Sequence, residues 1–115
     1  PPFNISYAAQ VAAAAALADK NQVRRSLRLV KTEMARLEAA FRKMDVAYVP
    51  SAGNFLLIDV SPHKGADVFA ALLKKGVIVR AVAEYGLPHY LRVTVGRPEE
   101  NTLFLKAFQE VRQSP

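Results

Sequence analysis

The 115-residue sequence contains no cysteine and no tryptophan, and only five glycines. Without cysteine the chain has neither disulfide bonds nor thiolate ligands for a metal, and this lack is compatible with a cytosolic origin. No apolar run approaches the ~20 residues that a membrane-spanning helix requires, and no signal peptide is recognisable. Gly-rich phosphate loops and the nucleophile elbow are missing as well. These absences exclude disulfide-stabilised, thiolate-metal and membrane-spanning classes for this sequence.

The composition fits a single folded domain with excess positive charge. Hydrophobic residues make up 51% of the chain and charged residues 23%, which is typical of a globular protein. The net charge of +6 is compatible with an anionic partner, but much of the excess falls on one predicted helix, where a solvated surface explains it better. The chain starts with Pro1-Pro2-Phe3-Asn4, which resembles a loop inside a protein, so we expect a fragment or a processed product.

Two helices are predicted in the first part of the chain. Residues 7–18 are rich in alanine, the strongest helix former, and the hydroxyl of Ser6 can cap the first turn. Residues 22–44 place apolar side chains at alternating spacings of four and three, which predicts a helix with one buried face. The members of this apolar seam are Val23, Leu27, Val30, Met34, Leu37, Phe41 and Met44. We interpret the seam as a core face rather than a coiled-coil dimer, because it spans only about three heptads.

The remaining residues predict short strands that alternate with two helices. The expected elements are an edge strand within 45–50, strands at 54–60, 77–82 and 91–95, and helices at 66–75 and from residue 98 onward. A strand–helix–strand unit implies parallel strands, and we expect the third strand between them in antiparallel pairing. We therefore predict an α+β fold: a small three- to four-stranded sheet with helices packed on one face, as a strand–helix–strand–strand–helix core preceded by two helices. The other face is expected to be partly free.

Two arginines on neighbouring predicted strands are candidates for a binding site. Alternation along strand 91–95 turns its apolar residues toward the helices and places Arg92 on the open side. Arg80 lies near the end of the preceding strand. A guanidinium group presents a planar pair of donors that fits a carboxylate or a phosphate. From the pattern alone, a solvated strand arginine explains both positions as well, so both interpretations stay open at this point.

The loop at residues 83–90 and the histidines offer weaker candidates. Tyr85, His89 and Tyr90 can line a pocket between the two strands. The histidines, His63 and His89, lie in separate loops without cysteine or paired carboxylates, so no metal site is predicted. The strand sequences LRVTV and VIVRAV carry no aromatic residue on which a base would stack, which argues against a nucleic-acid-binding sheet.

Four stretches of the sequence belong together as a pattern. They are PPFNISYAAQVAAAAALAD at residues 1–19, SAGNFLLIDV at 51–60, GVIVR at 76–80 and YLRVTVGRPEENTLFLKAF at 90–108. In this order they resemble the C-terminal small domain of histidinol-phosphate aminotransferases, which are pyridoxal-phosphate aminotransferases of fold type one. The stretch LRVTVG-x-PEEN is the most specific part, and the resemblance covers nearly the whole chain.

The resemblance implies roles for three residues. Arg92 matches the arginine that holds the acidic group of the substrate, Arg80 matches a second arginine that holds the phosphate, and Asn54 lies where the small domain approaches the active site. In this family the lysine of the Schiff base lies in the large domain, so no catalytic or cofactor-binding residue is expected in this chain. The resemblance also implies that residues 1–21 are a leading segment with the Ala-rich helix, and that residues 22–115 are the small domain of a larger chain.

For the full-length parent, the resemblance implies a cytoplasmic transaminase of histidine biosynthesis that depends on pyridoxal 5′-phosphate. Its expected substrates are histidinol phosphate, imidazole acetol phosphate, 2-oxoglutarate and glutamate. This chain is expected to clamp their phosphate or carboxylate groups, and to be inactive and free of cofactor by itself. Expected partners are the missing large domain and a second copy, by homodimerisation or self-association, with neither nucleic acid nor membrane. The alternatives are an aromatic amino-acid aminotransferase or a phospho-amino-acid decarboxylase of the same family, and a free-standing basic domain that binds an anion or a protein.

Overall fold

The structure is a computed structural model, and it describes residues 20–50 and 53–113. Its elements, in chain order, are α2 (Lys20–Lys43), β1 (Tyr48–Pro50), β2 (Phe55–Asp59), α3 (Gly65–Lys74), β3 (Arg80–Val82), the short 3₁₀ helix η1 (Ala83–Tyr85), β4 (Leu87–Thr94) and α4 (Pro98–Gln113). The helix predicted at residues 7–18, with its cap at Ser6, lies outside the described residues. In the part of the chain that the structure describes, no helix combines the length and the apolar character needed to cross a membrane.

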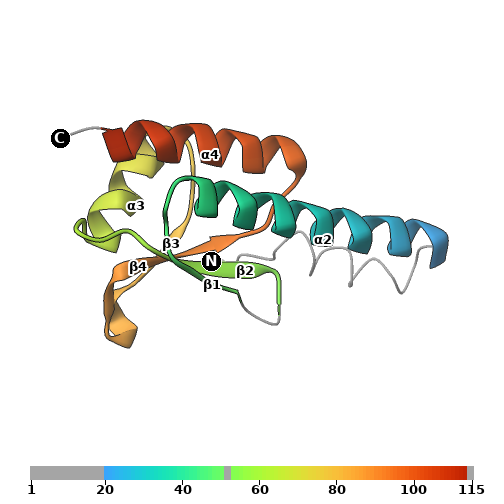
Figure 1. The fold of residues 1–115 in the computed structure, drawn as a ribbon, viewed down its shortest axis with the longest axis horizontal. Helices are drawn as coiled ribbons and strands as arrows, with labels where there is room; N and C mark the ends of the chain where they lie inside the picture. The colour runs from blue at the N-terminus through green and yellow to red at the C-terminus, as the bar shows by residue number, and fades with distance from the viewer. Residues whose placement is uncertain (1–19, 51–52, 114–115) are drawn as a thin grey trace.

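The described strands form one antiparallel sheet in the order β1-β2-β4-β3 (Figure 1). β4 pairs with β2 on one side and with β3 on the other, so β2 and β3 run in the same direction with β4 between them. This is the arrangement predicted for a strand–helix–strand unit with the third strand inserted. β1 lies at the edge of the sheet, where Pro50 is tolerated although it lacks a ladder donor. The predicted α+β fold is confirmed.

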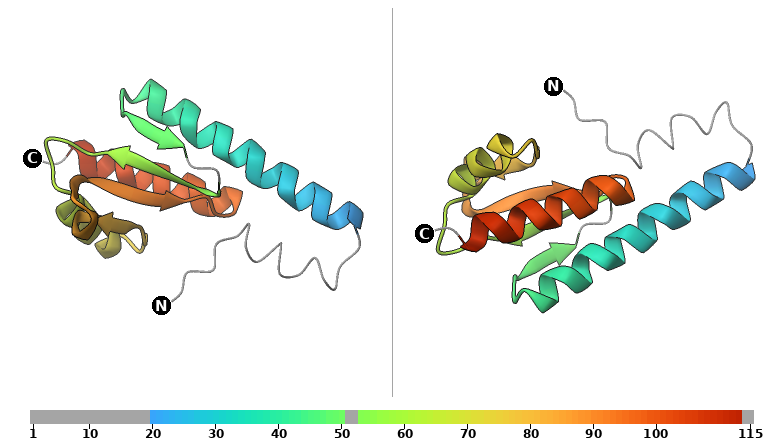
Figure 2. Two further views of the ribbon diagram at one scale, coloured as in Figure 1. Left: turned by 90° about the horizontal axis from the view of Figure 1, so that it is seen from below. Right: turned by 90° about the horizontal axis from the view of Figure 1, so that it is seen from above.

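Helices cover one face of the sheet. Seen from below, the strands lie in front of α4, and seen from above, α4 crosses in front of β2 and β4 (Figure 2). The burial of β2 and β4 alternates accordingly, with Leu56, Ile58, Leu91 and Val93 buried beneath the helices. This period of two is typical of a sheet with one face packed on a core. We refer to the other face as the open face, and its residues are Phe55, Leu57, Asp59, Arg80, Tyr90, Arg92 and Thr94.

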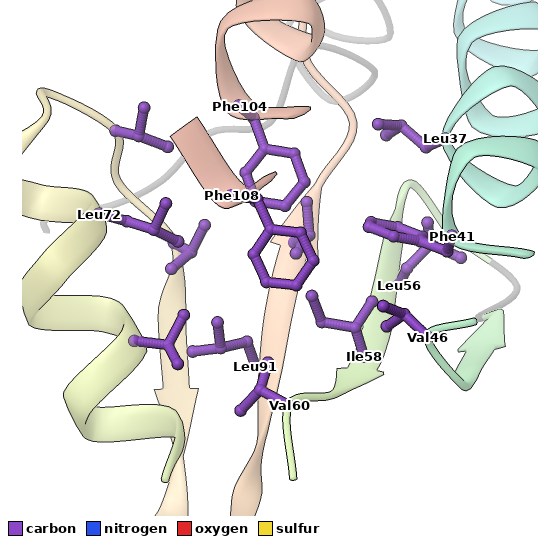
Figure 3. Close-up of a cluster of buried hydrophobic side chains, with 14 of the residues drawn as sticks. Leu37, Phe41, Val46, Leu56, Ile58, Val60, Leu72, Leu91, Phe104 and Phe108 are labelled. Carbon is purple, nitrogen blue, oxygen red and sulfur yellow. The ribbon is translucent and has the colours of Figure 1, made fainter. Parts of the chain in front are cut away.

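The core lies between the sheet and helices α2, α3 and α4. Phe41 of α2 meets Phe104 and Phe108 of α4 edge to face, with ring centroids 6.1 Å apart in each pair. Figure 3 shows these rings converging above the sheet, with Leu72 of α3 on one side and Leu91 of β4 below them. Each of the three helices therefore contributes to the same core, and the sheet is held as their common floor.

The apolar seam of α2 packs on this core from Val30 onward. Val30, Leu37 and Phe41 are buried, whereas Leu27 keeps 47% of its surface exposed. The N-terminal half of α2 extends past the sheet and past α4 (Figure 1). The predicted helix is confirmed, but its buried face includes a charged residue that the apolar seam omits, Glu33.

β3 begins at Arg80, three residues later than predicted. The reason lies in the end of α3, where Gly76 takes a positive φ of 81°. The amide of Gly76 donates to the carbonyl of Leu73 (2.9 Å), and the amide of Val77 donates to the carbonyl of Leu72 (3.0 Å). These two bonds form a Schellman motif, which satisfies the last carbonyls of the helix. Because Val77 caps the helix with its amide, the chain joins the ladder of β4 only at Arg80.

Candidate anion-binding site

The register of the sheet places Arg80 and Arg92 side by side on the open face. Arg80 is the direct partner of Arg92 in the β3–β4 pairing. On the other side of β4, Arg92 is paired with Leu57 of β2. Residues directly opposite in antiparallel strands share a face and have Cβ atoms about 4.5–5.5 Å apart. The structure thus places Arg92 on the open face, as strand alternation predicted, and it places Arg80 beside it.

Arg92 is supported by an aromatic ring of the neighbouring strand. Its guanidinium carbon lies 4.9 Å from the centroid of the Phe55 ring. A planar guanidinium stacked on a ring is already oriented, so it loses less freedom when it binds an anion. Arg92 is also half-buried, whereas Arg80 is exposed. Arg92 is therefore the preorganised member of the pair, and Arg80 is the solvent-exposed one.

Within residues 20–50 and 53–113, two buried side-chain donors have no hydrogen-bond partner: Nε of Arg92 and Nδ2 of Asn54. Asn54 precedes β2, and its backbone carbonyl accepts a hydrogen bond of 2.8 Å from the amide of Val95, which places it beside the end of β4. Leaving a buried donor without an acceptor costs about 1–3 kcal/mol. Both groups therefore favour a ligand that supplies an acceptor.

The open face carries positive charge that no carboxylate in the described part of the chain neutralises. Neither Arg80 nor Arg92 takes part in an ion pair there. Asp59, the acidic residue of β2 on this face, instead accepts hydrogen bonds from the hydroxyl (2.6 Å) and the amide (2.9 Å) of Ser61. The bond from the Ser61 hydroxyl, aided by the one from its amide, lowers the pKa of Asp59 below the ordinary value of 3.8. Asp59 is ionised at neutral pH, and its hydrogen bonds from Ser61 stabilise the turn after β2.

The loop residues suggested by the sequence do not gather around the arginines. Tyr85 in η1 is 74% exposed. Nδ1 of His89 lies 2.8 Å from the backbone carbonyl oxygen of His63, which ties the start of β4 to the loop before α3. Tyr90 shares the open face with Arg92, two residues away along β4. Of the three candidates, Tyr90 is the one that borders the arginine pair.

A separate hollow lies between α3 and the C-terminal part of α4. Its volume is about 570 Å³, and its lining residues are His63, Asp67, Val68, Ala70, Ala71, Lys74, Lys75 and Val111. Neither arginine belongs to this hollow. In the described ranges no group of three or more His, Asp and Glu side chains is placed to hold a metal ion. The arginine site is therefore a cationic patch on an open sheet face, separate from this hollow.

A buried polar cluster next to the arginine strand escaped the sequence analysis. Glu33 of α2 is 6% exposed, and Asn101 of α4 is 3% exposed. Nδ2 of Asn101 donates to Oε1 of Glu33 at 3.1 Å, and Asn101 also holds the backbone of Gly96 after β4. Glu33 lies three residues after Val30 and four before Leu37, so helical spacing alone places it on the buried face. That spacing was the available signal.

Comparison with known protein families identifies the family of the chain. Residues 1–108 match the family described as aminotransferase class I and II. The chain belongs to this family. It spans about 30% of the length of the relatives that it matches.

Several relatives of known sequence or structure carry the name histidinol-phosphate aminotransferase. Histidinol-phosphate aminotransferase 2 of Pseudomonas fluorescens (strain Pf0-1) is 46% identical over 110 residues, which cover 96% of this chain and 30% of the relative. Histidinol-phosphate aminotransferase of Akkermansia muciniphila is 44% identical over 110 residues, with the same coverage of 96% and 30%. The crystal structure of the enzyme of that name from Clostridium acetobutylicum has a TM-score of 0.76 and 27% identity, over 90% of this chain and 32% of that one. The Sinorhizobium meliloti enzyme, in complex with pyridoxal-5′-phosphate, has a TM-score of 0.66 and 27% identity, over 89% and 29%.

The residues of the open face of this aminotransferase chain do not by themselves fit a site for pyridoxal phosphate. That cofactor needs a lysine for its Schiff base and a partner for its pyridine nitrogen. Strands β2, β3 and β4 contain no lysine, and the carboxylate of Asp59 is bound to Ser61. The open face offers contacts to an anion, and no chemical step through the cofactor follows from it.

Proposed function

We propose that this chain is the substrate-clamping small domain of a pyridoxal-phosphate-dependent histidinol-phosphate aminotransferase, and that it is inactive by itself. In this proposal residues 1–21 lead in from the large domain and residues 22–115 form the small domain. Arg92 holds the acidic group of the substrate, Arg80 helps to hold a phosphate, and Asn54 borders the site. The names of the relatives support the activity, and the covered share of about 30% supports a division of labour with other parts of the enzyme.

One observation supports the clamp most directly. Arg80 and Arg92 stand opposite each other on the open face without an ion-pair partner among the described residues, and Nε of Arg92 is buried without an acceptor. A fold gains nothing from two adjacent unpaired cations, because like charges directly opposite in a sheet destabilise it. An anionic ligand removes the repulsion and satisfies the buried donor at the same time.

The chemistry of transamination explains why one clamp serves two substrates. An amino-acid donor carries a carboxylate, and a phosphorylated amine carries a phosphate, so each turnover presents an anionic group to the same place. Two parallel N–H donors of Arg92 match two oxygens of either group, and Arg80 adds charge for a phosphate dianion. Pyridoxal phosphate, when bound by the whole enzyme, supplies the electron sink for the reaction. The residues of this chain bind and orient the substrate, which lowers the entropic cost of reaching the reactive geometry.

The second arginine favours a phosphorylated substrate over an aromatic amino acid, since an aromatic side chain has no use for the additional charge. A decarboxylase from Sulfurospirillum multivorans also shares the fold, with a TM-score of 0.76, but at 23% identity this likeness speaks for the fold alone. A free-standing domain that binds an anion without catalysis would use the same two arginines. The substrate and the presence of catalysis therefore have to be decided by assay.

The partners belong to the same proposal. Leu27 and the half-buried Val23 lie on the part of α2 that extends past the sheet, and an exposed apolar surface of this kind suits a protein contact. We propose that the large domain or a second copy of the chain contacts this surface. The whole enzyme is then a homodimer that acts in histidine biosynthesis in the cytoplasm. The isolated chain is then expected to self-associate, which sedimentation velocity at rising concentration measures. A monomer at every concentration would count against this part.

The assay uses the full-length protein that carries this chain. Transamination of 2-oxoglutarate is measured with histidinol phosphate, phenylalanine and tyrosine as amino donors. We expect the highest kcat/KM for histidinol phosphate. We expect Arg92→Ala to raise KM more than it lowers kcat, because its contact is made in the ground state and in the transition state alike. Charged hydrogen bonds contribute about 1.5–3 kcal/mol, which corresponds to a KM increase of about 10- to 100-fold.

A substrate comparison isolates the role of Arg80. Arg80→Gln is expected to lower kcat/KM for histidinol phosphate and to leave that for phenylalanine nearly unchanged. Arg28→Gln, which removes an exposed cation of α2, serves as the matched control. A preference for the aromatic donors would contradict the substrate assignment. Equal losses in the Arg80 and Arg28 variants would remove Arg80 from the site, and anion binding by a protein without any transaminase activity would support the free-standing domain.

A further inference from the structure

The buried cluster of Glu33 and Asn101, joined by the partly exposed Arg36, lies outside the open face but next to the strand that carries Arg92. We propose that Glu33 and Asn101 are positioning residues for Arg92: they hold the end of β4 so that the guanidinium group is placed to bind an anion. This role rests on the proposed function, in which Arg92 holds the acidic group of the substrate. It extends that function to two residues that do not touch the substrate.

Asn101 binds both backbone polar groups of Gly96. Its Oδ1 accepts a hydrogen bond from the amide of Gly96, and its Nδ2 donates to the carbonyl of the same residue, each at 2.9 Å. The preceding residue, Val95, donates its amide to the carbonyl of Asn54 at 2.8 Å. The chain beyond β4 is therefore held at two consecutive residues. Arg92 lies four residues upstream, about 13 Å away along an extended strand.

Glu33 in turn fixes Asn101. Its Oε1 accepts the hydrogen bond from Asn101 at 3.1 Å and two from Arg36 at 2.7 and 3.1 Å. The guanidinium group of Arg36 also donates to the carbonyl of Pro98 (2.9 Å) and to the hydroxyl of Thr102 (3.1 Å). α2 is thereby bonded to the first turn of α4 and, through Asn101, to the end of β4.

The chemistry of this cluster suits positioning better than stability. Apolar residues in place of a buried ion pair often leave a protein as stable or more stable. A buried network whose members must all be satisfied instead permits one arrangement and penalises small displacements. Glu100 also packs against this turn, because a Cβ on Gly96 would lie 2.7 Å from its Oε1. The cluster therefore defines where β4 ends.

Arg92 depends on the placement of β4 because its neighbours belong to other strands. The Phe55 ring lies on β2 and Arg80 lies on β3, while the buried Nε of Arg92 has no partner. Among the described residues, the strand backbone and the Phe55 ring are what orient the guanidinium group. A displacement of the end of β4 therefore changes the anion site although none of its residues has changed.

The test compares the 115-residue chain with the variants Asn101→Asp, Glu33→Gln and the two combined. Sulfate is the probe, because its charge stays constant between about pH 7 and pH 5, where phosphate titrates. Binding is measured by NMR on the Nε–Hε signal of Arg92, which is assigned by its loss in Arg92→Lys. Glu110→Gln, which removes an exposed acid of α4 paired with Lys75, is the charge-matched control for Glu33→Gln and is expected to bind sulfate as the wild type does.

The Asn101→Asp variant sets a carboxylate against Glu33. Two carboxylates in one buried site cannot both be ionised without repulsion, so the end of β4 is pushed away at neutral pH. We expect the sulfate affinity to fall about tenfold at neutral pH, a typical coupling between residues in contact. As the pH approaches about 5, a proton shared by the two carboxylates restores the bond and the affinity recovers. In the double variant, the side-chain amide introduced by Glu33→Gln can donate a hydrogen bond to the carboxylate introduced by Asn101→Asp. The double variant is therefore expected to recover sulfate affinity at neutral pH.

Each result decides for or against the positioning role. A sulfate affinity in Asn101→Asp equal to that of the wild type overturns the role. A loss of affinity that persists at acidic pH and in the double variant with Glu33→Gln also overturns it, because a merely structural defect does not depend on a proton. If Asn101→Asp does not fold, Glu33→Gln decides: weaker sulfate binding in a folded chain supports the role, and unchanged binding overturns it. Failure of the clamp looks different, since the wild type then binds no sulfate at Arg92. In that case the hydrogen exchange of Arg92 Hε is compared between the wild type and whichever variant folds. Faster exchange in the variant supports the positioning role, and equal exchange overturns it.

Discussion

Arg80 and Arg92 are direct partners in the antiparallel pairing of β3 with β4, so two guanidinium groups share one face of the sheet. In the described part of the chain neither has a carboxylate within ion-pair distance. Cross-strand pairs of like charge oppose folding, whereas the same pair attracts a phosphate or a carboxylate. The two arginines therefore favour anion binding at the expense of the stability of the fold, and both effects can be measured.

Removal of one charge is expected to stabilise the chain and weaken the site. Arg80→Gln relieves the repulsion on Arg92, so we expect the free energy of unfolding to rise by about 0.2–1 kcal/mol at low salt. The gain should shrink at about 1 M salt, where the Debye length is about 3 Å. Thermal unfolding at both salt concentrations measures it, and Arg28→Gln on α2 is the control. If Arg80→Gln lowers the stability of the chain and leaves its sulfate affinity unchanged, both the expected stabilisation and the expected loss of anion binding are wrong.

The ring of Phe55 is expected to contribute to anion binding although it carries no charge. It lies 4.9 Å from the guanidinium carbon of Arg92 and orients that group before a ligand arrives. Phe55→Leu keeps an apolar residue at the position but removes the stacking, which is worth about 0.5–1 kcal/mol at exposed sites. We expect sulfate affinity at Arg92 to fall about two- to fivefold. Phe69→Leu, which shortens a half-buried ring of α3, is the control, and equal losses in both variants would point to a general loss of packing instead.

The close approach of α3 to β4 is expected to tolerate only glycine at residue 65. A Cβ at Gly65 would clash with the backbone carbonyl oxygen of Tyr90, and backbone cannot move aside as a flexible side chain can. Overpacking of this kind costs about 1–3 kcal/mol, so Gly65→Ala should lower the melting temperature by several degrees, at about 4–8 °C per kcal/mol. Gly86→Asn is the control, because its φ of 81° suits asparagine and nothing lies near its Cβ. Equal melting temperatures for Gly65→Ala and the wild type would disprove the close packing.

The acid stability of the chain is expected to depend on Glu33. The hydrogen bond from Arg36 lowers the pKa of Glu33 below the ordinary value of 4.5, aided by the one from Asn101 and opposed by burial. Since the pKa is lower in the folded state, the contribution of Glu33 is present above about pH 4.5 and is lost as the pH falls through the folded-state pKa. Wild type should therefore lose stability in acid more steeply than Glu33→Gln.

Two acidic residues have to be separated in that experiment. The pKa of Asp59 is lowered as well, by its bonds from Ser61, so Glu33→Gln is expected to keep part of the acid slope. Asp59→Asn should remove a further part, whose loss begins below about pH 3.8, whereas that of Glu33 begins below about pH 4.5. Melting temperatures recorded from neutral pH into acid give the slopes. Parallel curves for wild type and Glu33→Gln would show that the folded state does not favour the ionised Glu33.

The sequence predicted the parts of the site that depend on one strand or one helix. Alternation around Arg92 placed it opposite the buried residues, and Gly76 marked the end of α3. The register between β3 and β4 was beyond reach, because an irregularity at Ala81 and Val82 intervenes and the ladder starts late. The pairing of Arg80 with Arg92 follows from that register. Glu33 and Asn101 are 68 residues apart, and no local pattern indicates that they meet.

The amino-acid sequence by itself determined the described helices, the strand faces and the order of these elements, since hydrophobic spacing and the chemistry of helix ends act over a few residues. It also carried the pattern that links the chain to the aminotransferases. Tertiary structure alone decided which residues meet: Arg80 beside Arg92, the Phe55 ring beneath a guanidinium group, and Glu33 bonded to Asn101. Such contacts depend on strand register and on the packing of α2 and α4 against one sheet, so they exist only once the whole core has formed.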